Sequence, residues 1–434
     1  MLLANLLFVC VVQTPTGVAG MDQWRDTELP SLVAFYKELH QSPELSFQEE
    51  QTAGKMAAVL DKHGFEVIEG IGGFGVAGVL RNGPGPVVMV RADMDGLPIL
   101  EDTNLPYSSE VTATEADGRT VAVMHACGHD VHMSVWAGCA SFLAANREAW
   151  SGTLLFVAQP AEERGAGARL MLADRLFERS VTPNFCLGFH VAPDLPAGVI
   201  GSCSGYALAN VDSVDIKVLG LGGHGSTPEK THDPIALAAR IVMGLQTLIS
   251  REVAPQDPAV VTVGSIHGGA KHNIIPDHVD LQLTVRSYKP GVRQQLLDGI
   301  RRVAINEARA AGFPEELMPL VKVKDEHTPS AFNDPELVTR VNQTLESVLG
   351  ADRLVLVPPV MGGEDFGRYG PAADAPGYLM WLGACERGLW DEAQKEGAAA
   401  LPGLHTKDFA PDPLPTIATG VEAMCAAVIS LLPV

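Results

Sequence analysis

The chain has 434 residues, of which 46% are hydrophobic and 19% are charged, a composition typical of soluble globular proteins with two or three domains. Its net charge of −21, with no cluster of Lys and Arg, argues against nucleic acid or an anionic membrane as partner. The seven Cys residues include no C-x-x-C pair, so disulfides are not expected to organise the fold.

The N-terminus carries an apolar run, Leu2–Val12, that is too short to span a bilayer. Small residues follow it up to Gly20, as in a signal peptide, although no Lys or Arg precedes the run. If residues 1–20 are such a signal, the protein is periplasmic or secreted. If Met21 is the true start, it is cytoplasmic. No stable membrane span is expected in either case.

Amphipathic patterns predict helices over Leu32–Leu39 and Glu49–His63, followed by strands over 65–68, 75–80 and 87–91. The segment Gly70–Gly75 matches the G-x-G-x-x-G pattern of dinucleotide-binding loops. That pattern needs a helix after it, whereas residues that favour strands follow here. We therefore predict a turn between two strands.

Four apolar runs each lead directly into acidic or metal-binding residues. The runs are Val87–Val90, Val121–Met124, Leu154–Ala158 and Phe185–Phe189, followed in turn by Asp93 and Asp95, by His125–His132, by Glu162 and Glu163, and by His190. Uninterrupted apolar runs predict strands buried on both faces of a largely parallel sheet. Ligands bind at the carboxyl ends of such strands, so we expect these motifs to meet in one crevice.

The pattern changes after about Ala207. Strands over 211–219, 259–266, 278–287 and 320–324, with helices over 234–249 and 292–311, predict a ferredoxin-like β-α-β-β-α-β module. Helix and strand alternation then resumes. The predicted fold is α/β, with a mixed, largely parallel sheet covered by helices over 21–207 and 325–434, and an inserted α+β domain over 208–324.

The segment Met124–His132 holds four potential metal ligands, His125, Cys127, His129 and His132. In an extended chain the first three would project to one side. Spacing alone leaves both a metal site and ordinary packing open. With Glu162, Glu163, His190 and His405, however, the set combines a thiolate, imidazoles and carboxylates, which suit zinc and other borderline divalent metals.

The number of ligands favours two metals that share a bridging ligand and activate a water molecule, lowering its pKa towards ~7. One carboxylate of the Glu162–Glu163 pair can bind a metal while the other acts as general base. The plausible reaction is hydrolysis of an acyl bond. A rival mechanism makes Cys127 the nucleophile. The neighbouring glutamates oppose a metal-free thiolate, so we rank it lower.

Eight motifs occur in order from about Leu32 to the C-terminus. They are Leu39–His40 with Pro43–Glu49, Arg91–Pro98, His125–Asp130, Gln159–Glu163, Gly222–Gly225, Asn273–Pro276, Gly363–Phe366 and His405–Thr406. This series resembles the metallopeptidase-like amidohydrolases of the aminoacylase and hippurate hydrolase family, which includes N-acyl-amino-acid amidohydrolases and plant auxin-conjugate hydrolases.

The resemblance implies a catalytic domain that binds two divalent metals, zinc or manganese, with cobalt or nickel as alternatives. The implied metal ligands are Cys127, His129, Glu163, His190 and His405. Glu162 would be the catalytic base, and Asp95 would orient a histidine of the metal site. The inserted domain would be a lid that forms a homodimer. From it, His224 and Asn273 would stabilise the oxyanion or hold substrate, and Arg286 would bind a substrate carboxylate.

Two departures concern the pocket. Leu283 stands where the family usually has Gly, and the segment Trp390–Leu404 is longer than usual. The expected function is metal-dependent hydrolysis of the amide bond of N-acyl-amino acids or related small peptides, releasing a carboxylic acid and an amino acid. The alternatives are dipeptidase or carboxypeptidase specificity, or a non-catalytic protein that binds a carboxylate ligand on the same fold.

Overall fold

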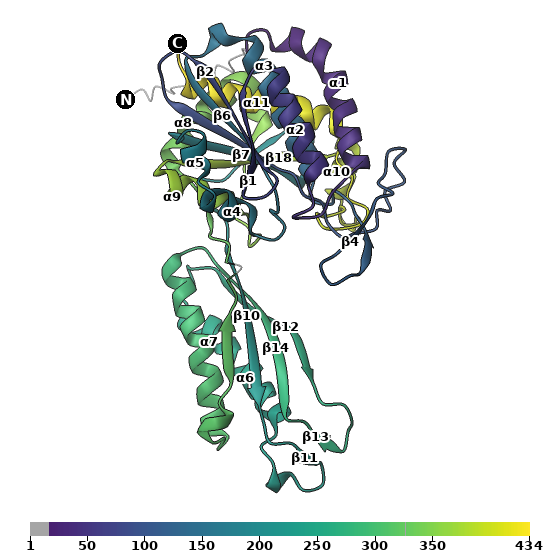
Figure 1. Ribbon diagram of the computed structural model, residues 1–434, viewed down its shortest axis with the longest axis vertical. Coiled ribbons are helices and arrows are strands. Elements are labelled where there is room, and N and C mark those ends of the chain that lie inside the picture. The colour runs from purple at the N-terminus through teal and green to yellow at the C-terminus, as the bar shows by residue number, and fades with distance from the viewer. Residues whose placement is uncertain (1–16, 326) are drawn as a thin grey trace, which may run out of the picture.

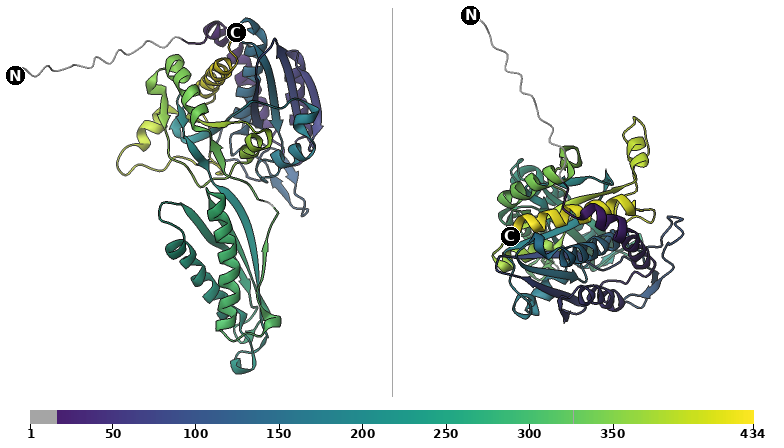
Figure 2. Two further views of the ribbon diagram at one scale, coloured as in Figure 1. Left: turned by 90° about the vertical axis from the view of Figure 1, so that its left-hand side faces the viewer. Right: turned by 90° about the horizontal axis from the view of Figure 1, so that it is seen from above.

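The computed structural model describes residues 17–325 and 327–434. They form a larger α/β unit and a narrower, elongated unit that extends from one side of it (Figures 1 and 2). Of the predicted signal segment, residues 1–16 lie outside the described residues. Export therefore stays a prediction.

The larger unit is built on an eight-stranded sheet with the strand order β1-β2-β6-β3-β7-β18-β8-β17. Its strands are β1 (Glu66–Ile71), β2 (Gly75–Asn82), β3 (Val87–Asp93), β6 (Gly152–Gln159), β7 (Phe185–Pro196), β8 (Ile200–Ser202), β17 (Leu354–Leu356) and β18 (Gly377–Cys385). The four central strands, β6, β3, β7 and β18, run parallel. The mixed, largely parallel sheet is confirmed.

The central strands are buried on both faces, as their apolar runs predict. In β3, Val88 and Val90 pack into one hydrophobic cluster, whereas Met89 between them packs into a second cluster on the other face. In β6, Phe156 and Val157 divide in the same way. Alternate side chains of a strand point to opposite faces, so both faces need helices over them.

Helices cover both faces of this sheet (Figure 1). On the first face lie α1 (Met21–Gln41), α2 (Glu50–Lys62), α3 (His129–Ala145), α8 (Pro335–Leu349) and α11 (Pro413–Leu431). On the second face lie α4 (Gly167–Ala173), α5 (Leu176–Arg179) and α9 (Tyr369–Ala373). Among the described helices only α11 is long and apolar enough to cross a membrane, but 72% of its apolar stretch is buried inside the protein.

The predicted sheet strand over Val121–Met124 is wrong. The strand β5 (Thr120–Ala122) pairs with β4 (Thr112–Thr114) in a separate two-stranded ribbon. Both neighbouring positions beside β3 are taken by β6 and β7. Val123 and Met124 are nevertheless buried. The run is apolar because Met124 at its end packs into the hydrophobic cluster on the first face of the sheet, not because the run joins the sheet.

The elongated unit has its own antiparallel sheet, in the order β12-β14-β10-β15. The strands are β10 (Asn210–Leu219), β12 (Ala259–Gly268), β14 (His278–Ser287) and β15 (Leu320–Val323). The helices α6 (Pro234–Thr247) and α7 (Pro290–Ala310) cover one face and form a separate core with it. The elements follow the predicted β-α-β-β-α-β order. We call this unit the lid; its lid and dimerisation roles stay predictions.

The chain enters and leaves the lid at neighbouring points. Val211, at the start of β10, exchanges backbone hydrogen bonds with Thr328, after β15. Just outside them, β9 (Gly205–Leu208) pairs with β16 (Ala331–Asn333). One face of the lid sheet is not covered by α6 and α7. The residues of this open face that stand nearest the entry point of the chain therefore lie next to the larger unit.

A buried ion triad joins α1 to the start of α3. His40 Nδ1 lies 2.7 Å from Asp130 Oδ2, and His40 Nε2 lies 3.1 Å from Glu101 Oε1. Burial lowers the pKa of His40, but hydrogen bonds to the two carboxylates outweigh it and raise the pKa to about 9. His40 is therefore a buried cation that fixes the helix on which His129 stands.

We predict that the His40 triad makes stability depend on pH. The folded pKa of about 9 lies above the unfolded value of 6.5, so the stabilisation is complete below pH 6.5 and is lost as pH rises through 9. Wild type should therefore have a larger free energy of unfolding than His40→Gln, and this difference should fall by about 3 kcal/mol as pH rises from 6.5 to 9. Urea unfolding at several pH values measures it. A constant difference would contradict the prediction, and His267→Gln, at an exposed lid position, is the control.

Candidate metal centre

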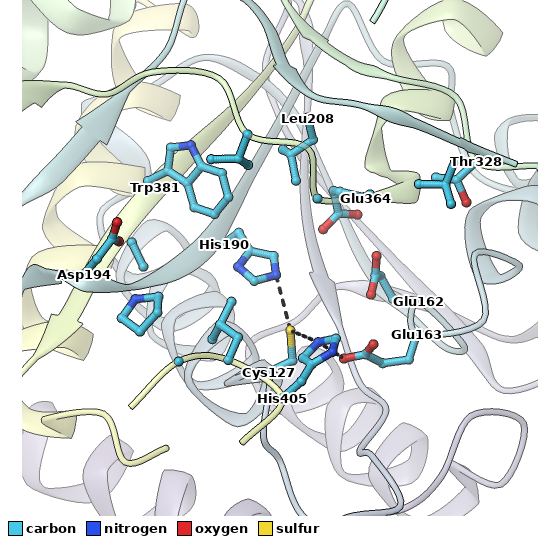
Figure 3. A pocket seen from close by; sticks show the side chains of 18 of the residues that line it. Cys127, Glu162, Glu163, His190, Asp194, Leu208, Thr328, Glu364, Trp381 and His405 are labelled. Atoms are coloured by element: carbon cyan, nitrogen blue, oxygen red, sulfur yellow. Dashed lines mark hydrogen bonds and ion pairs between the residues drawn. The ribbon is translucent and has the colours of Figure 1, made fainter. Parts of the chain in front are cut away.

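The sequence-predicted metal ligands converge at the carboxyl end of the central strands (Figure 3). Glu163 follows β6, His190 lies in β7, Cys127 lies in the turn before α3, and His129 is the first residue of α3. Overlapping groups of these residues have ligand atoms within 4.8 Å of one another. The groups are Cys127, His129 and His190; Cys127, Glu163 and His405; and His129, Glu162 and Glu163.

The Cys127 sulfur lies between two histidines. Its Sγ is 3.5 Å from His190 Nε2 and 3.2 Å from His405 Nε2. Glu163 Oε1 lies 3.3 Å from His405 Nε2 and 3.9 Å from His129 Nε2. Cys127 therefore belongs to two ligand groups, one with His129 and His190 and one with Glu163 and His405.

A tight turn, not an extended segment, presents Cys127. The N–H of Gly128 donates to the carbonyl of His125 at 3.2 Å, and Gly128 has φ of +76°. A Cβ at Gly128 would lie only 2.6 Å from Val191. Glycine is therefore required both by the positive φ and by the lack of space for a side chain. The predicted alternation is therefore wrong for His125, which belongs to none of the ligand groups within residues 17–325 and 327–434.

Asp95 holds the turn that carries the two glutamates. Its carboxylate accepts the backbone N–H groups of Glu162 and Glu163 at 3.1 and 3.0 Å, and Asp95 Oδ1 lies 3.3 Å from His129 Nδ1. Glu49 accepts the N–H of Ala161 at 2.7 Å, where the backbone has φ of +50°. Both acids therefore orient the glutamates through the backbone.

A charged network lies behind the ligands. Arg91, fully buried, pairs with Asp93 at 2.7 Å, Glu364 at 2.8 Å and Asp365 at 3.2 Å. The other oxygen of Asp93 lies 2.6 Å from His132 Nδ1. His132 Nε2 in turn accepts the N–H of Val191, the neighbour of His190, at 2.9 Å. Support of this kind orients metal ligands.

This network includes Asp93 and Asp365, for which the sequence indicates no role, and Glu364, for which it predicts only support of the metal ligands. Asp93 follows the apolar run Val87–Val90, and Glu364 and Asp365 belong to the motif Gly363–Phe366. Glu49 was likewise only part of the first motif. In the sequence, these acids are recognisable only by their position after a buried strand or within a motif. Neither position shows which residue the carboxylate contacts.

The carboxylates control protonation throughout the centre. Burial lowers the pKa of His129, but Asp93 and Asp95 outweigh it and raise the pKa to about 10. Burial, then Glu364 and Glu163, raises the pKa of Glu162. Burial together with Glu163 and Glu162 raises the pKa of the Cys127 thiol, which disfavours a metal-free thiolate nucleophile.

The centre fits divalent metal ions. His129 Nε2 is buried without a hydrogen-bond partner among the described residues, and Glu163 Oε1 lies 3.9 Å from it. Buried polar atoms normally have a partner, so this nitrogen calls for one that the protein does not supply. A thiol, three imidazoles and a carboxylate are ligands that zinc and related metals prefer.

The centre opens into a cleft of about 1090 Å³ between the larger unit and the lid. Arg286, on the open face of β14, lines this cleft and donates to the carbonyl of Met361 at 2.9 Å. Leu283 instead packs into the lid core, so this departure from the family pattern does not line the cleft.

His224 and Asn273 do not line the cleft. They lie at the short strands β11 (Gly223–His224) and β13 (Ile274–Ile275), at the end of the lid farthest from the larger unit (Figure 1). The N–H of Gly225 donates to the carbonyl of Asn273, so the two residues lie close together. Within one chain they are separated from the metal ligands.

Residues 89–398 match the family model described as Peptidase family M20/M25/M40. The chain belongs to this family. Thermostable carboxypeptidase 1 of Saccharolobus solfataricus is 35% identical over 81% of the chain and 85% of that protein. Hippurate hydrolase of Campylobacter jejuni is 36% identical over 76% of the chain and 82% of that protein. The predicted family resemblance is confirmed.

A solved structure supports the same assignment. A Bacillus subtilis protein, described as a dinuclear metal binding peptidase from the M20 family, is similar with a TM-score of 0.74 and 30% sequence identity, over 94% of this chain and 100% of that one. As a family member with this cluster of ligands, the protein is a metal-dependent hydrolase of amide bonds. The predictions of fold class and enzyme class are confirmed.

We predict that Asp95→Asn weakens metal binding. The amide would point an N–H towards a backbone donor and lose the acceptor beside His129. Loss of such support typically costs 10–100-fold in metal affinity. Competition with a chromophoric chelator measures it. Asp117→Asn, at an exposed carboxylate, is the matched control, and equal affinity of the Asp95 variant and wild type would contradict the role of Asp95.

Proposed function

We propose that the protein hydrolyses the amide bond of N-acyl-amino acids or related small peptides, releasing a carboxylic acid and an amino acid. One observation carries this proposal. The carboxyl of Glu162 lines the cleft in one ligand group with His129 and Glu163, and His129 Nε2 is buried there without a hydrogen-bond partner among the described residues. This arrangement suits a general base next to a Lewis-acid centre.

We infer that two divalent ions are held there, zinc or manganese, with cobalt or nickel as alternatives. Their ligands would be Cys127, His129, Glu163, His190 and His405, with the Cys127 sulfur shared. When bound, the ions would supply Lewis acidity to the substrate carbonyl and to the attacking water. Binding would also displace the protons that the carboxylates hold on His129 and Cys127.

Glu162 would move the protons of the reaction. It takes a proton from the attacking water and returns it to the departing amine nitrogen. Its backbone N–H is held by Asp95 at 3.1 Å, which fixes the turn that carries its side chain towards the cleft. Arg286, with one N–H bonded to Met361, keeps its other donors for a substrate carboxylate, for which its planar fork is suited.

We further propose a homodimer through the lid, in which His224 and Asn273 serve the site of the partner subunit. Three observations favour it. His224 and Asn273 are remote from their own cleft, His224 is exposed, and apolar residues near them are exposed too: Leu221 by 52%, Ile266 by 53% and Ile274 by 52%. A side chain that stabilises an oxyanion must approach within about 3 Å of it.

One alternative remains distinct from this proposal. Carboxypeptidase or dipeptidase specificity would use the same chemistry, and the similarity to a carboxypeptidase favours testing it. The non-catalytic binding protein considered from the sequence is set aside, because the chain belongs to a hydrolase family and Glu162 and all five ligands are present. A panel of N-acyl-amino acids and dipeptides, with added Mn²⁺, Zn²⁺ or Co²⁺, separates the two specificities.

We predict that Glu162→Gln lowers kcat by at least about 10²–10⁴-fold, because the general base is lost. Bound metal should be retained, since Glu162 is not one of the proposed ligands. Steady-state kinetics and elemental analysis measure the two quantities. Glu148→Gln, at an exposed glutamate, is the control. Activity of the Glu162 variant near that of wild type would refute its assigned role.

The dimer proposal predicts complementation between two inactive variants. In mixtures of Glu162→Gln and His224→Ala subunits, each mixed dimer would hold one site with both residues intact. Random mixing by refolding should then restore about a quarter of wild-type specific activity, since half of the dimers are mixed. If His224 acts in its own subunit or not at all, mixing restores nothing beyond the sum of the two preparations.

A further inference from the structure

Glu162 and Glu163 line the cleft (Figure 3) and stand on a turn that begins at a strained residue. Ala161 is fully buried and has φ of +50°, a left-handed conformation that is costly for a residue with a side chain. Its carbonyl accepts the N–H groups of Ala166 and Gly167 at 3.2 and 3.1 Å, which closes the turn. The backbone at Ala161 therefore sets the direction in which both glutamates leave the turn.

Two acids hold the N–H groups of this turn, one residue after another. Glu49 Oε1 accepts the N–H of Ala161 at 2.7 Å, and Asp95 accepts those of Glu162 and Glu163 at 3.1 and 3.0 Å. Three successive N–H groups therefore converge on two carboxyl groups. Strained backbone persists only where its surroundings hold it, so the turn depends on these two acids.

The two acids differ in the number of donors that they meet. Asp95 accepts two N–H groups and the hydroxyl of Ser46, the latter at 2.6 Å, and donors of this number stabilise a buried negative charge. Within the described chain Glu49 accepts one hydrogen bond, that from Ala161, and its Oε2 is buried without a partner. An ionised carboxylate is costly to bury with so few donors. Glu49 is therefore the acid of this pair that is better kept neutral.

The charged surroundings of Glu49 also oppose its ionisation. No cation pairs with it among the described residues, and Asp95 faces it from the segment after β3. Free N–H groups at the start of α2 would favour a negative charge, but Glu44 accepts those of Gln51 and Thr52 at 3.2 and 2.8 Å. Burial and then the charge of Asp95 raise the pKa of Glu49 to about 8, although nearby backbone N–H groups lower it.

We propose that Glu49 is a positioning residue that acts as a neutral acid: with its proton on Oε2, it holds the strained turn at Ala161 and so keeps Glu162 directed into the cleft. This inference rests on the proposed role of Glu162 as general base. A second negative charge beside Asp95 would drive the two acids apart, together with the N–H groups that they hold. A neutral carbonyl oxygen accepts the N–H of Ala161 without that repulsion.

The first test separates a neutral acceptor from a carboxylate in the metal-loaded enzyme. Glu49→Gln keeps a neutral oxygen in the same place, so its kcat should stay close to that of wild type. Glu49→Ala removes the acceptor and should lower kcat by about 10²-fold with KM little changed, because the base is misplaced. Glu50→Gln and Glu50→Ala, at the exposed neighbouring glutamate, are the matched controls. An equal loss of kcat in Glu49→Gln and Glu49→Ala would overturn the neutral role.

The second test asks whether Glu49 acts through the turn. Glycine adopts a positive φ without the cost that Ala161 bears, so the turn should form in Ala161→Gly even without the acceptor. Ala161→Gly alone should leave kcat close to that of wild type. Combined with Glu49→Ala, it should raise kcat by about tenfold over Glu49→Ala alone. A double variant no more active than Glu49→Ala would show that the hydrogen bond does not act through this turn.

The third test measures the charge of Glu49 without catalysis, by urea unfolding of the metal-free protein at several pH values. Wild type should lose stability relative to Glu49→Gln as pH rises from 4.5 to 8, because the unfolded carboxyl ionises at about 4.5 and the folded one, with a pKa of about 8, stays protonated. Between about pH 5 and 8 the ratio of the two unfolding constants should change by more than about 100-fold. A ratio that is independent of pH would mean that Glu49 ionises like an exposed acid, which overturns the proposal.

The outcomes separate this inference from the proposed function. If wild type with added metal hydrolyses no N-acyl-amino acid or dipeptide, the proposed function is overturned, and with it the base that Glu49 positions. If wild type is active and Glu49→Ala has the same kcat, only the positioning role is overturned. If Glu49→Ala does not fold, the activity of Glu49→Gln and the pH dependence of its unfolding still decide.

Discussion

A buried excess of carboxylates is the constraint on which the catalytic centre depends. Arg91 alone neutralises part of the negative charge of Asp93, Glu364 and Asp365, while Glu162 and Glu163 lie nearby. Unpaired charge is costly to bury, so the remainder must be compensated by protons or cations. The raised pKa values of Glu162, Cys127 and His129 are the metal-free form of this compensation. Divalent ions would be the other form.

The sequence alone predicted the parts of the site that lie at the ends of buried strands. Buried parallel strands deliver their following residues to one edge, so Glu163 and His190 could be expected together from their apolar runs. The motif series supplied His405, which no local pattern connects to the others. Conversely, the prediction for Val121–Met124 was wrong because a segment that packs against the core has the same apolar pattern as a buried strand. The turn at Gly128 could not be recognised behind this apolar run.

The arrangement of distant segments in space also limited what could be predicted from the sequence. Nothing in the local sequence around His224 shows that its strand lies at the far end of an inserted unit, because that depends on the length and pairing of β10 and β14. The supporting acids were hidden for a different reason. Glu49 acts through the backbone of Ala161, more than a hundred residues away, and a hydrogen bond of that kind leaves no pattern in sequence.

The position of β18 determines the order in which the molecule can be completed. This strand lies between β7 and β8 within the main sheet, yet the chain reaches it only after the whole of the lid. A ribosome therefore finishes the lid, with its separate core, while the main sheet still has a gap in it. His405 follows later still. The newly made chain cannot hold metal with its full set of ligands until synthesis is nearly over.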